Sequence, residues 1–222
     1  MSRNTATHRD TLTKQRLRSI LRVLNAEYSQ SKTALNYGDP FQLLVAVILS
    51  AQCTDARVNQ VTPVLFSHLR TPFEFAKADV EMIERLIHST GFFRNKAKNI
   101  KACAQAIIRE HNGTVPDTME LLHRLPGVGR KTANVVLGEV FGRVEGIVVD
   151  THVARLSKRL GFTDNINPVA IEQDLMSIVP KKSWYRFSHS LILHGRAVCK
   201  ARNPNCPVCS LKNYCPSAKI IR

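Results

Sequence analysis

Apolar residues recur along most of the chain with the three- and four-residue spacing of an amphipathic helix. The first stripe consists of Leu17, Ile20, Leu21 and Leu24. Later helical segments are expected within 79–91, 96–111, 130–140, 151–160, 168–178 and 183–198. Only the segment 147–149 is typical of a strand, and three residues cannot make a sheet. The pattern therefore predicts an all-α fold.

Capping residues mark where several of these helices begin. Asp39 and Pro40 precede the apolar run 41–49, so we expect a buried helix there rather than a strand. Pro63 is expected to kink or shorten the helix that follows. The remaining start signals are Thr54 or Asp55, Asp79, Asp117, Asp150 or Thr151, and Asn167.

A glycine-rich turn joins two of the predicted helices. The segment 125–133 reads Leu-Pro-Gly-Val-Gly-Arg-Lys-Thr-Ala, between a short helix that Asp117 opens and the helix 130–140. Such a helix-hairpin-helix turn aims free backbone N–H groups outward, which suits a phosphate. The glycines permit positive φ and close approach of another surface. Lys131 then lies in the first helical turn, where it would face DNA.

The charge balance points to a polyanionic partner. The chain has 222 residues, of which 32 are Lys or Arg and 17 are Asp or Glu, giving a net charge of +15. Neutralised phosphates release counterions, so this excess favours nucleic acid over a merely solubilising surface. The length and the 44% hydrophobic content allow one compact unit, of one or two lobes.

No apolar run is long enough for a transmembrane helix, and the polar start lacks the apolar core of a secretory signal. An organellar transit peptide is the alternative reading of the basic N-terminus, which Asp10 interrupts. We expect a cytoplasmic, nucleoid-associated monomer that does not bind membranes.

Four cysteines near the C-terminus form a compact metal-binding pattern: Cys199, Cys206, Cys209 and Cys215. Disulfides are disfavoured in a reducing compartment. Four-thiolate zinc sites usually use two C-x2–4-C pairs, whereas here one such pair is flanked by longer gaps, which suits an iron–sulfur cube. The other two, Cys53 and Cys103, are expected to be small core residues.

Together these motifs resemble the endonuclease III branch of the helix-hairpin-helix DNA glycosylases. They stand at 49–55 (Leu-Ser-Ala-Gln-Cys-Thr-Asp), 125–133, 149–153 (Val-Asp-Thr-His-Val) and the cysteine quartet. The resemblance runs from about Leu17 to Cys215. Four motifs in order are far more specific than a lone hairpin.

The resemblance implies a two-lobed helical glycosylase fold with DNA between the lobes. A six-helix domain would span 33–143, and 1–32 with 144–222 would form a discontinuous domain. The quartet would hold a [4Fe–4S] cluster with a mainly structural role. The expected partner is double-stranded DNA that carries damaged pyrimidines or abasic sites.

By the same resemblance Lys131 is the nucleophile and Asp150 the catalytic carboxylate of a bifunctional glycosylase and abasic-site (AP) lyase. Excision followed by strand cleavage at one sugar needs a nucleophile that stays attached as an iminium, which a primary amine can do. A carboxylate would stabilise the oxocarbenium-like sugar. From the residues alone, Lys131 could instead contact phosphate and Asp150 could simply cap a helix.

Several further residues match the family's DNA-contacting positions. Gln52 matches the side chain that fills the gap left by an extruded base, and Phe92 matches the wedge into the opposite strand, where the family often has an aliphatic residue. Asp55 and His152 align with the lesion pocket, and Ser50 lies near it. The remaining expected DNA contacts are Leu125, Gly127, Val128, Gly129, Arg130, Thr132, Lys200 and Arg202.

Other functions remain open at this point. The mismatch adenine glycosylases share the hairpin and cluster but lack the hairpin lysine, and a pyrimidine-dimer glycosylase would use the same residues. A non-catalytic DNA-structure-binding protein would not need both Lys131 and Asp150. An electron carrier would leave the hairpin and the +15 charge unexplained. The connection from Lys131 to Asp150 is expected to be a residue longer than usual, which would shift lesion preference.

Overall fold

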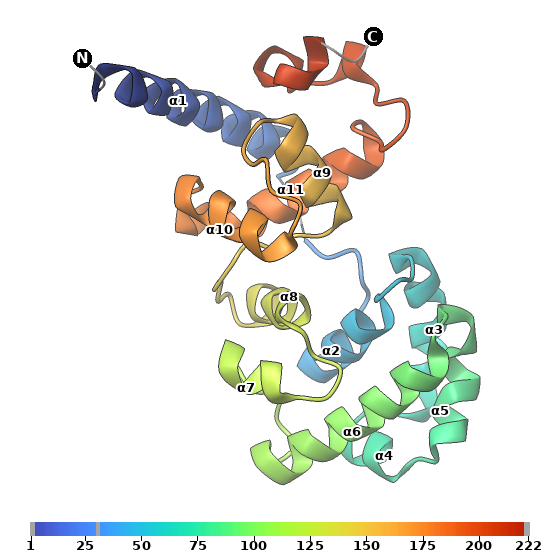
Figure 1. The fold of residues 1–222 in the computed structure, drawn as a ribbon. Helices are drawn as coiled ribbons and strands as arrows, with labels where there is room; N and C mark the ends of the chain where they lie inside the picture. The colour runs from blue at the N-terminus through green and yellow to red at the C-terminus, as the bar shows by residue number, and fades with distance from the viewer. Residues whose placement is uncertain (1–2, 30–31, 220–222) are drawn as a thin grey trace. The chain divides into compact units, whose positions relative to one another are not determined.

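The computed structural model describes residues 3–29 and 32–219, with side chains described for 14–29 and 32–218. Within these ranges the chain forms α-helices and short 3-10 turns and no strand, which confirms the predicted all-α fold. The segment 147–149 has no regular secondary structure and belongs to the connection between the helices that Figure 1 labels α8 and α9. The α-helices are α1 (Arg3–Glu27), α2 (Pro40–Leu49), α3 (Asp55–His68), α4 (Pro72–Lys77), α5 (Val80–Ile87), α6 (Phe93–His111), α7 (Met119–Arg124), α8 (Arg130–Val140), α9 (Thr151–Arg159), α10 (Pro168–Ile178) and α11 (Trp184–Ala197). The 3-10 turns are η1 (His88–Thr90), η2 (Lys181–Ser183), η3 (Cys206–Val208), η4 (Lys212–Tyr214) and η5 (Pro216–Lys219).

The described chain divides into two compact units. One comprises 33–145, and the other comprises the described parts of 1–32 and 146–222. The helices α2 to α8 belong to the first, and α1 together with α9 to α11 belongs to the second. The division falls after Glu145, shortly beyond the boundary at Arg143 expected from the sequence.

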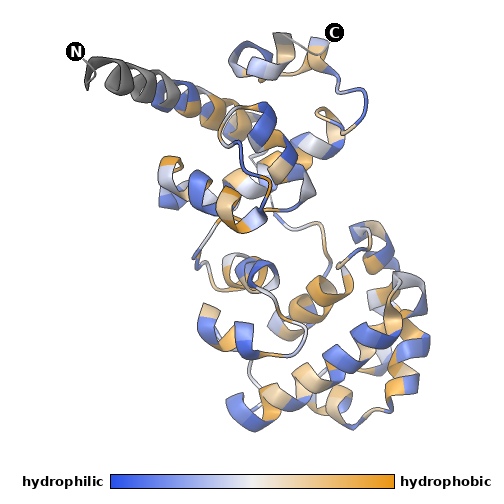
Figure 2. Ribbon diagram, viewed as in Figure 1, coloured by the Kyte–Doolittle hydropathy of each residue, from blue (hydrophilic) through white to orange (hydrophobic). Residues whose placement is uncertain are grey.

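The unit 33–145 is built around α2. Leu43, Leu44 and Leu49 are fully buried, and Figure 2 shows hydrophobic residues along this helix. It packs against α3, α6 and α8, while α6 packs against α4 and α5. The carboxylate of Asp39 accepts the Gln42 N–H at 2.9 Å, which confirms the predicted start of this buried helix.

The other unit joins the two ends of the chain. α1 packs against α11, which also packs against α9, and α9 contacts α10. Leu17, Ile20 and Leu24 of α1 are buried in one core with Phe187 and Leu191 of α11. The first apolar stripe therefore covers a helix that lies more than a hundred residues later in the sequence.

Two helix starts follow the predicted pattern, whereas the effect predicted for Pro63 does not. Thr54 caps α3 by accepting the Arg57 N–H at 3.2 Å, and Asn167 caps α10. α3 runs through Pro63 to His68, so the predicted shortening is wrong. Pro63 is exposed, and the carbonyl that its ring leaves without an N–H partner can be solvated.

The helix start expected at Asp79 is confirmed in position, and the one expected at Asp117 lies one residue later. Asp79 occupies the N-cap position of α5, but its side chain makes no capping hydrogen bond. At α7 the cap is Thr118, whose hydroxyl accepts the Leu121 N–H at 3.4 Å. The Asp117 carboxylate pairs instead with Arg143 at 2.8 Å, in the segment that follows α8. Asp117 therefore forms an ion pair with Arg143 and does not cap α7.

Candidate functional site

The turn of the helix-hairpin-helix is anchored in the core of its unit. The Val128 N–H donates to the Leu125 carbonyl at 3.1 Å, and both side chains are buried. Gly127 has φ +76°, and a Cβ there would lie 2.8 Å from the Cβ of Asn99 on α6. Only glycine fits both the backbone and the space. Because the side chains of Leu125 and Val128 face inward, a DNA contact at these residues would come from the backbone.

The other glycine of the turn has a different use. Gly129 is the N-cap residue of α8 with φ −83°, so it does not use the positive φ that glycine permits. Nothing lies within 4 Å of the position that a Cβ would take. The start of α8 has no side-chain cap, and its first N–H groups carry the partial positive charge of a helix N-terminus. Gly129 thus keeps this surface open to another molecule.

Lys131 lies at this open helix start. It is the second residue of α8 and its side chain is exposed, as is that of Arg130, while Thr132 is half-buried. A primary amine here stands beside backbone donors that suit a phosphate, as the sequence predicted.

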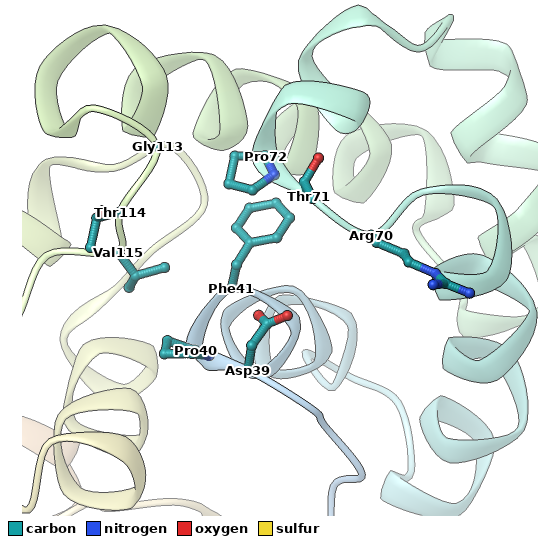
Figure 3. Close-up of a pocket in the computed structure, with 9 residues that line it drawn as sticks. All are labelled: Asp39, Pro40, Phe41, Arg70, Thr71, Pro72, Gly113, Thr114 and Val115. Carbon is teal, nitrogen blue, oxygen red and sulfur yellow. The ribbon is translucent and has the colours of Figure 1, made fainter.

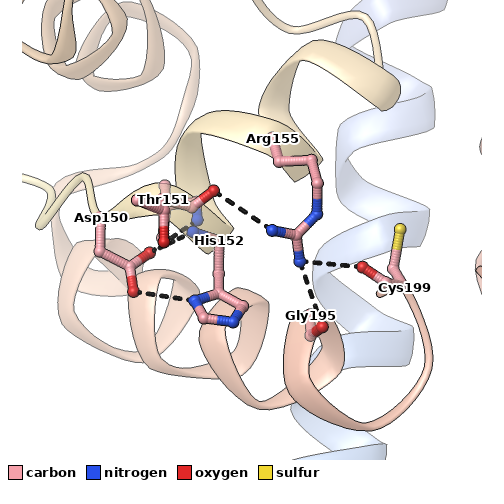
Figure 4. A network of polar contacts seen from close by, with 7 residues as sticks. Asp150, Thr151, His152, Arg155, Gly195 and Cys199 are labelled. Carbon is pink, nitrogen blue, oxygen red and sulfur yellow. Dashed lines mark hydrogen bonds and ion pairs between the residues drawn. The ribbon is translucent and has the colours of Figure 1, made fainter. Parts of the chain in front are cut away.

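Asp150 is held in place by its own helix. It is the N-cap residue of α9, and its Oδ1 accepts the N–H groups of His152 and Val153, both at 2.8 Å (Figure 4). Its Oδ2 lies 3.2 Å from the Nδ1 of the His152 ring. The Asp150 side chain is only 14% exposed. The carboxylate is therefore held in one position, and it caps α9, which is one of the two roles considered for Asp150 from the sequence.

His152 is wedged against α11. A Cβ on Gly195 would lie 2.9 Å from the His152 Cδ2, so the glycine makes room for the ring. One turn further along α9, Arg155 donates through Nη2 to the carbonyls of Gly195 at 3.2 Å and Cys199 at 3.0 Å. Burial, above all, lowers the pKa of Arg155. This residue, which the sequence analysis missed, ties the helix of Asp150 to the cysteine loop; no local pattern indicates it, because its acceptors lie 40 and 44 residues away in the sequence.

The predicted DNA-contacting residues of 49–55 lie on the connection between α2 and α3. Ser50 is the C-cap of α2, and its hydroxyl donates to the Val47 carbonyl at 2.8 Å. Gln52 is exposed and has φ +53°, a left-handed conformation that is uncommon for a residue with a side chain. Asp55 is half-buried in the first turn of α3.

Phe92 shares the backbone conformation of Gln52. It has φ +48° at the N-cap position of α6, and 64% of its surface is exposed. The alternative of core packing for this side chain is therefore wrong. A large apolar side chain held outward by a strained backbone is an unusual surface feature.

The four C-terminal cysteines are half-buried and lie among short 3-10 turns. Burial, first of all, raises the pKa of the Cys209 and Cys215 thiols, so these sulfurs need a positive partner in order to ionise. Backbone N–H groups point at both: that of Leu211 at Cys209 and those of Ser217 and Ala218 at Cys215. Sulfur-only donors of this kind fit an iron–sulfur cluster.

Two basic side chains also contact these sulfurs. Arg159 Nη1 donates to the Cys199 Sγ at 3.2 Å, and His194 Nε2 lies 3.3 Å from the Cys209 Sγ. Across the residues that the structure describes, no three His, Cys, Asp or Glu side chains close around a single-ion position.

Lys200 and Arg202 are exposed on the loop after Cys199. Arg159 of α9 holds the backbone of this loop, because it donates to the carbonyls of Lys200 at 2.8 Å and Ala201 at 3.0 Å. Within the unit 33–145, Cys103 is a buried core residue, and the half-buried Cys53 packs against the same core, as predicted.

A pocket of about 250 Å³ lies in the unit 33–145, at the start of α2 (Figure 3). It is lined by Asp39, Pro40, Phe41, Arg70, Thr71, Pro72, Gly113, Thr114 and Val115. None of the residues expected to act on DNA lines it.

Two family profiles match the chain. The HhH-GPD superfamily of base excision DNA repair proteins matches residues 45–181, and the iron-sulfur binding domain of endonuclease III matches 199–215. Endonuclease III of Synechocystis sp. is 54% identical over 93% of this chain and 94% of that protein. Endonuclease III of Escherichia coli strain K12 is 41% identical over 88% of this chain and 92% of that protein.

Solved structures agree. A non-covalent endonuclease III–DNA complex superposes with a TM-score of 0.88 at 45% identity, over 93% of this chain and 97% of that chain. A thermostable thymine-DNA glycosylase shares the fold, with a TM-score of 0.84 at 21% identity over 94% of this chain and 99% of that chain. No helix in the described part of the sequence is long and apolar enough to span a membrane. The chain belongs to the endonuclease III family, and it is a base-excision DNA glycosylase and AP lyase with a [4Fe–4S] cluster.

Proposed function

We propose that the enzyme removes oxidised pyrimidines from duplex DNA through a Schiff base at Lys131 and cuts the strand 3′ to the resulting abasic site by β-elimination. The observation that carries this proposal is the exposed Lys131 at an uncapped helix start, beside a turn kept open by Gly129. A relative at 45% identity has been solved as a trapped covalent intermediate with DNA, which supports covalent chemistry in this family.

The amine nitrogen attacks C1′ of the damaged nucleotide, and the bond from C1′ to the base breaks with its electron pair leaving on the base. The base takes up a proton. The C1′–O4′ bond then breaks, O4′ takes up a proton, and C1′ stays joined to Lys131 as an iminium, which acidifies the neighbouring C2′ proton. Loss of that proton expels the 3′ phosphate, and hydrolysis of the imine releases the free lysine. Water as nucleophile would stop after base removal.

Asp150 supplies the negative charge beside the developing oxocarbenium-like sugar. Its Oδ1 accepts two backbone N–H groups, which fixes the carboxylate, while its Oδ2 faces the His152 ring. Lys131 and Asp150 belong to different units. The proposal therefore requires that bound DNA presents one sugar to both residues.

The remaining roles follow the same proposal. Gln52 fills the gap left by the extruded base, and Phe92 enters the opposite strand. Backbone N–H groups of the hairpin bind phosphate, and Lys200 and Arg202 add phosphate contacts from the cysteine loop. Ser50, Asp55 and His152 line the lesion pocket. We expect excision and strand cleavage to occur on chromosomal DNA in the cytoplasm.

We assign the [4Fe–4S] cluster to Cys199, Cys206, Cys209 and Cys215. When bound, the cluster would cross-link the four cysteine sulfurs through iron–thiolate bonds and so would hold the loop that carries Lys200 and Arg202. The proposed domain limits are 33–143 for the hairpin domain, and 1–32 with 144–222 for the cluster domain.

The test uses a 5′-labelled duplex with a single thymine glycol. The native enzyme should cut it at the lesion without alkali, and Lys131→Ala should not. Lys77→Ala removes another exposed lysine of the same unit, in the last turn of α4, and should cut normally. Cleavage by Lys131→Ala, or breaks that need alkali in the native enzyme, would contradict the lysine mechanism. Tight binding without base removal would favour a DNA-structure-binding protein instead.

A further inference from the structure

Lys96 stands apart from the other lysines. It lies in the first turn of α6 and is 5% exposed, and it is the only buried lysine among the side chains that the structure describes. Its Nζ donates to the carbonyls of Leu49 at 2.8 Å and Thr90 at 2.9 Å. Burial lowers the pKa of this ammonium, and the nearby Cys53 thiol opposes part of that effect.

The two acceptors end the two segments that precede Gln52 and Phe92. Leu49 is the last residue of α2, and the connection with Gln52 begins after it. Thr90 is the last residue of η1, and Phe92 follows two residues later. One buried amine thus joins, by direct hydrogen bonds, two connections that are far apart in the sequence.

Gln52 and Phe92 need such support. Both are exposed and both have a left-handed backbone, with φ of +53° and +48°. A residue other than glycine in this region is strained and persists only where its surroundings fix it. A buried ammonium is also costly unless its hydrogen bonds are made. An apolar residue would fill the same space without that cost, so the contacts with both carbonyls are the specific property of Lys96.

We propose that Lys96 is a positioning residue that couples the Gln52 and Phe92 connections, so that both side chains enter DNA as one rigid pair when the damaged nucleotide is extruded. The inference rests on the proposed roles of Gln52 and Phe92. It adds a residue that touches neither DNA nor the reacting atoms.

The same helix provides a matched control. Lys101 Nζ donates to the Ala78 carbonyl at 2.7 Å, at the end of α4 and outside both connections. Lys96→Met and Lys101→Met each keep most of the aliphatic stem and remove one amine from a carbonyl contact. The first should disturb Gln52 and Phe92, and the second should not.

Single-turnover rates on two duplexes separate extrusion from the later chemistry. On a thymine glycol duplex, Lys96→Met should lower the rate of base removal at least roughly ten-fold, because a stacked base must be extruded. On the same duplex with a preformed abasic site, where no base has to be unstacked, the rate of cleavage should stay within about three-fold of the native rate. Lys101→Met should change neither rate. Equal losses on both duplexes, or no loss, would overturn the proposal.

Two further measurements separate positioning from general damage. In a Gln52→Ala background, Lys96→Met should lower the rate by a smaller factor than in the native background, because one of the two side chains that it positions is gone. Additive costs would overturn the coupling. Without any substrate, hydrogen exchange at 50–53 and 90–93 should accelerate in Lys96→Met and not in Lys101→Met.

If Lys96→Met does not fold, Lys96→Gln takes its place, since an amide can still donate to one carbonyl and should restore part of the rate. A native enzyme inactive on both duplexes would be a failure of the proposed function. A native enzyme active on both, with Lys96→Met equally active, would be a failure of this inference alone.

Discussion

The backbone N–H of His152 donates to Asp150 Oδ1 at 2.8 Å, while the His152 ring nitrogen Nδ1 lies 3.2 Å from the other carboxylate oxygen. The same carboxylate therefore caps α9 and keeps a second oxygen facing an imidazole. Asp150 can therefore cap α9 and act in catalysis at the same time, and substitutions can separate the two roles.

Asp150→Asn should separate the two roles. Asparagine is as good an N-cap as aspartate, so the melting temperature should barely change. The loss of negative charge should lower the rate of base removal by about 10²–10⁴-fold. Asp150→Ala should lose the cap as well and cost about 1 kcal/mol in the free energy of unfolding. Thermal melts and single-turnover excision measure both quantities; an active Asp150→Asn would leave only the capping role.

The two hairpin glycines should respond in opposite ways to alanine. Gly127→Ala places a Cβ 2.8 Å from the Asn99 Cβ at φ +76°, so we expect a loss of stability of about 1–3 kcal/mol. Gly129→Ala meets no atom within 4 Å and has an ordinary φ, so its stability should stay within about 1 kcal/mol of the native value. The added methyl at Gly129 should instead weaken binding to an abasic-site duplex. Denaturation and equilibrium DNA binding check the pair, and unchanged DNA affinity in Gly129→Ala would show that DNA does not approach there.

Removal of the iron–sulfur cluster should loosen one unit only. In 199–218, Leu211 is the only hydrophobic side chain that is buried, and the rest is short turns and half-buried cysteines. Without the cluster, the cross-links between the four cysteines would be lost. Limited proteolysis of the cluster-free protein should therefore cut first within 199–218 and spare 33–145. Equal protection with and without the cluster would contradict a structural role for it.

Cys103 gives a pH-dependent prediction. Burial raises the pKa of this thiol from 9.0 to about 12. The unfolded thiol loses its proton above about pH 9 while the folded one keeps it, so stability falls as pH rises through this window, by about 1.4 kcal/mol per pH unit. Below pH 8 the thiol contributes no slope. Denaturant unfolding of the native protein and of Cys103→Val between pH 8 and 10 should diverge, and parallel curves would show that the buried thiol ionises normally.

Much of the fold could be predicted because local signals and tertiary packing agree. The Asp39 cap and the all-apolar run behind it allow one outcome, a buried helix. Helix α8 begins and ends where the pattern placed it, at Arg130 and Val140. The hairpin glycines were recognisable from the sequence, although only Gly127 has positive φ.

The errors arise where a residue has a distant partner. Asp117 is a good cap by type, but Arg143 attracts its carboxylate from beyond α8. Lysine is usually a surface residue, so its type does not predict that Lys96 is buried. The only local signal is that Lys96 lies four residues before the buried Ile100, on the same face of α6. Its acceptor at Leu49 is 47 residues away, which no local pattern shows.

Borohydride trapping tests directly whether Lys131 is the nucleophile. The native enzyme and Lys77→Ala, incubated with a thymine glycol duplex and borohydride, should each give a covalent protein–DNA complex, and peptide mapping should place the reduced bond on the Lys131 side chain. Lys131→Ala should bind the same DNA and give no complex. A complex that persists in Lys131→Ala, or that maps to another amine, would contradict the assignment of the nucleophile and with it the proposed mechanism.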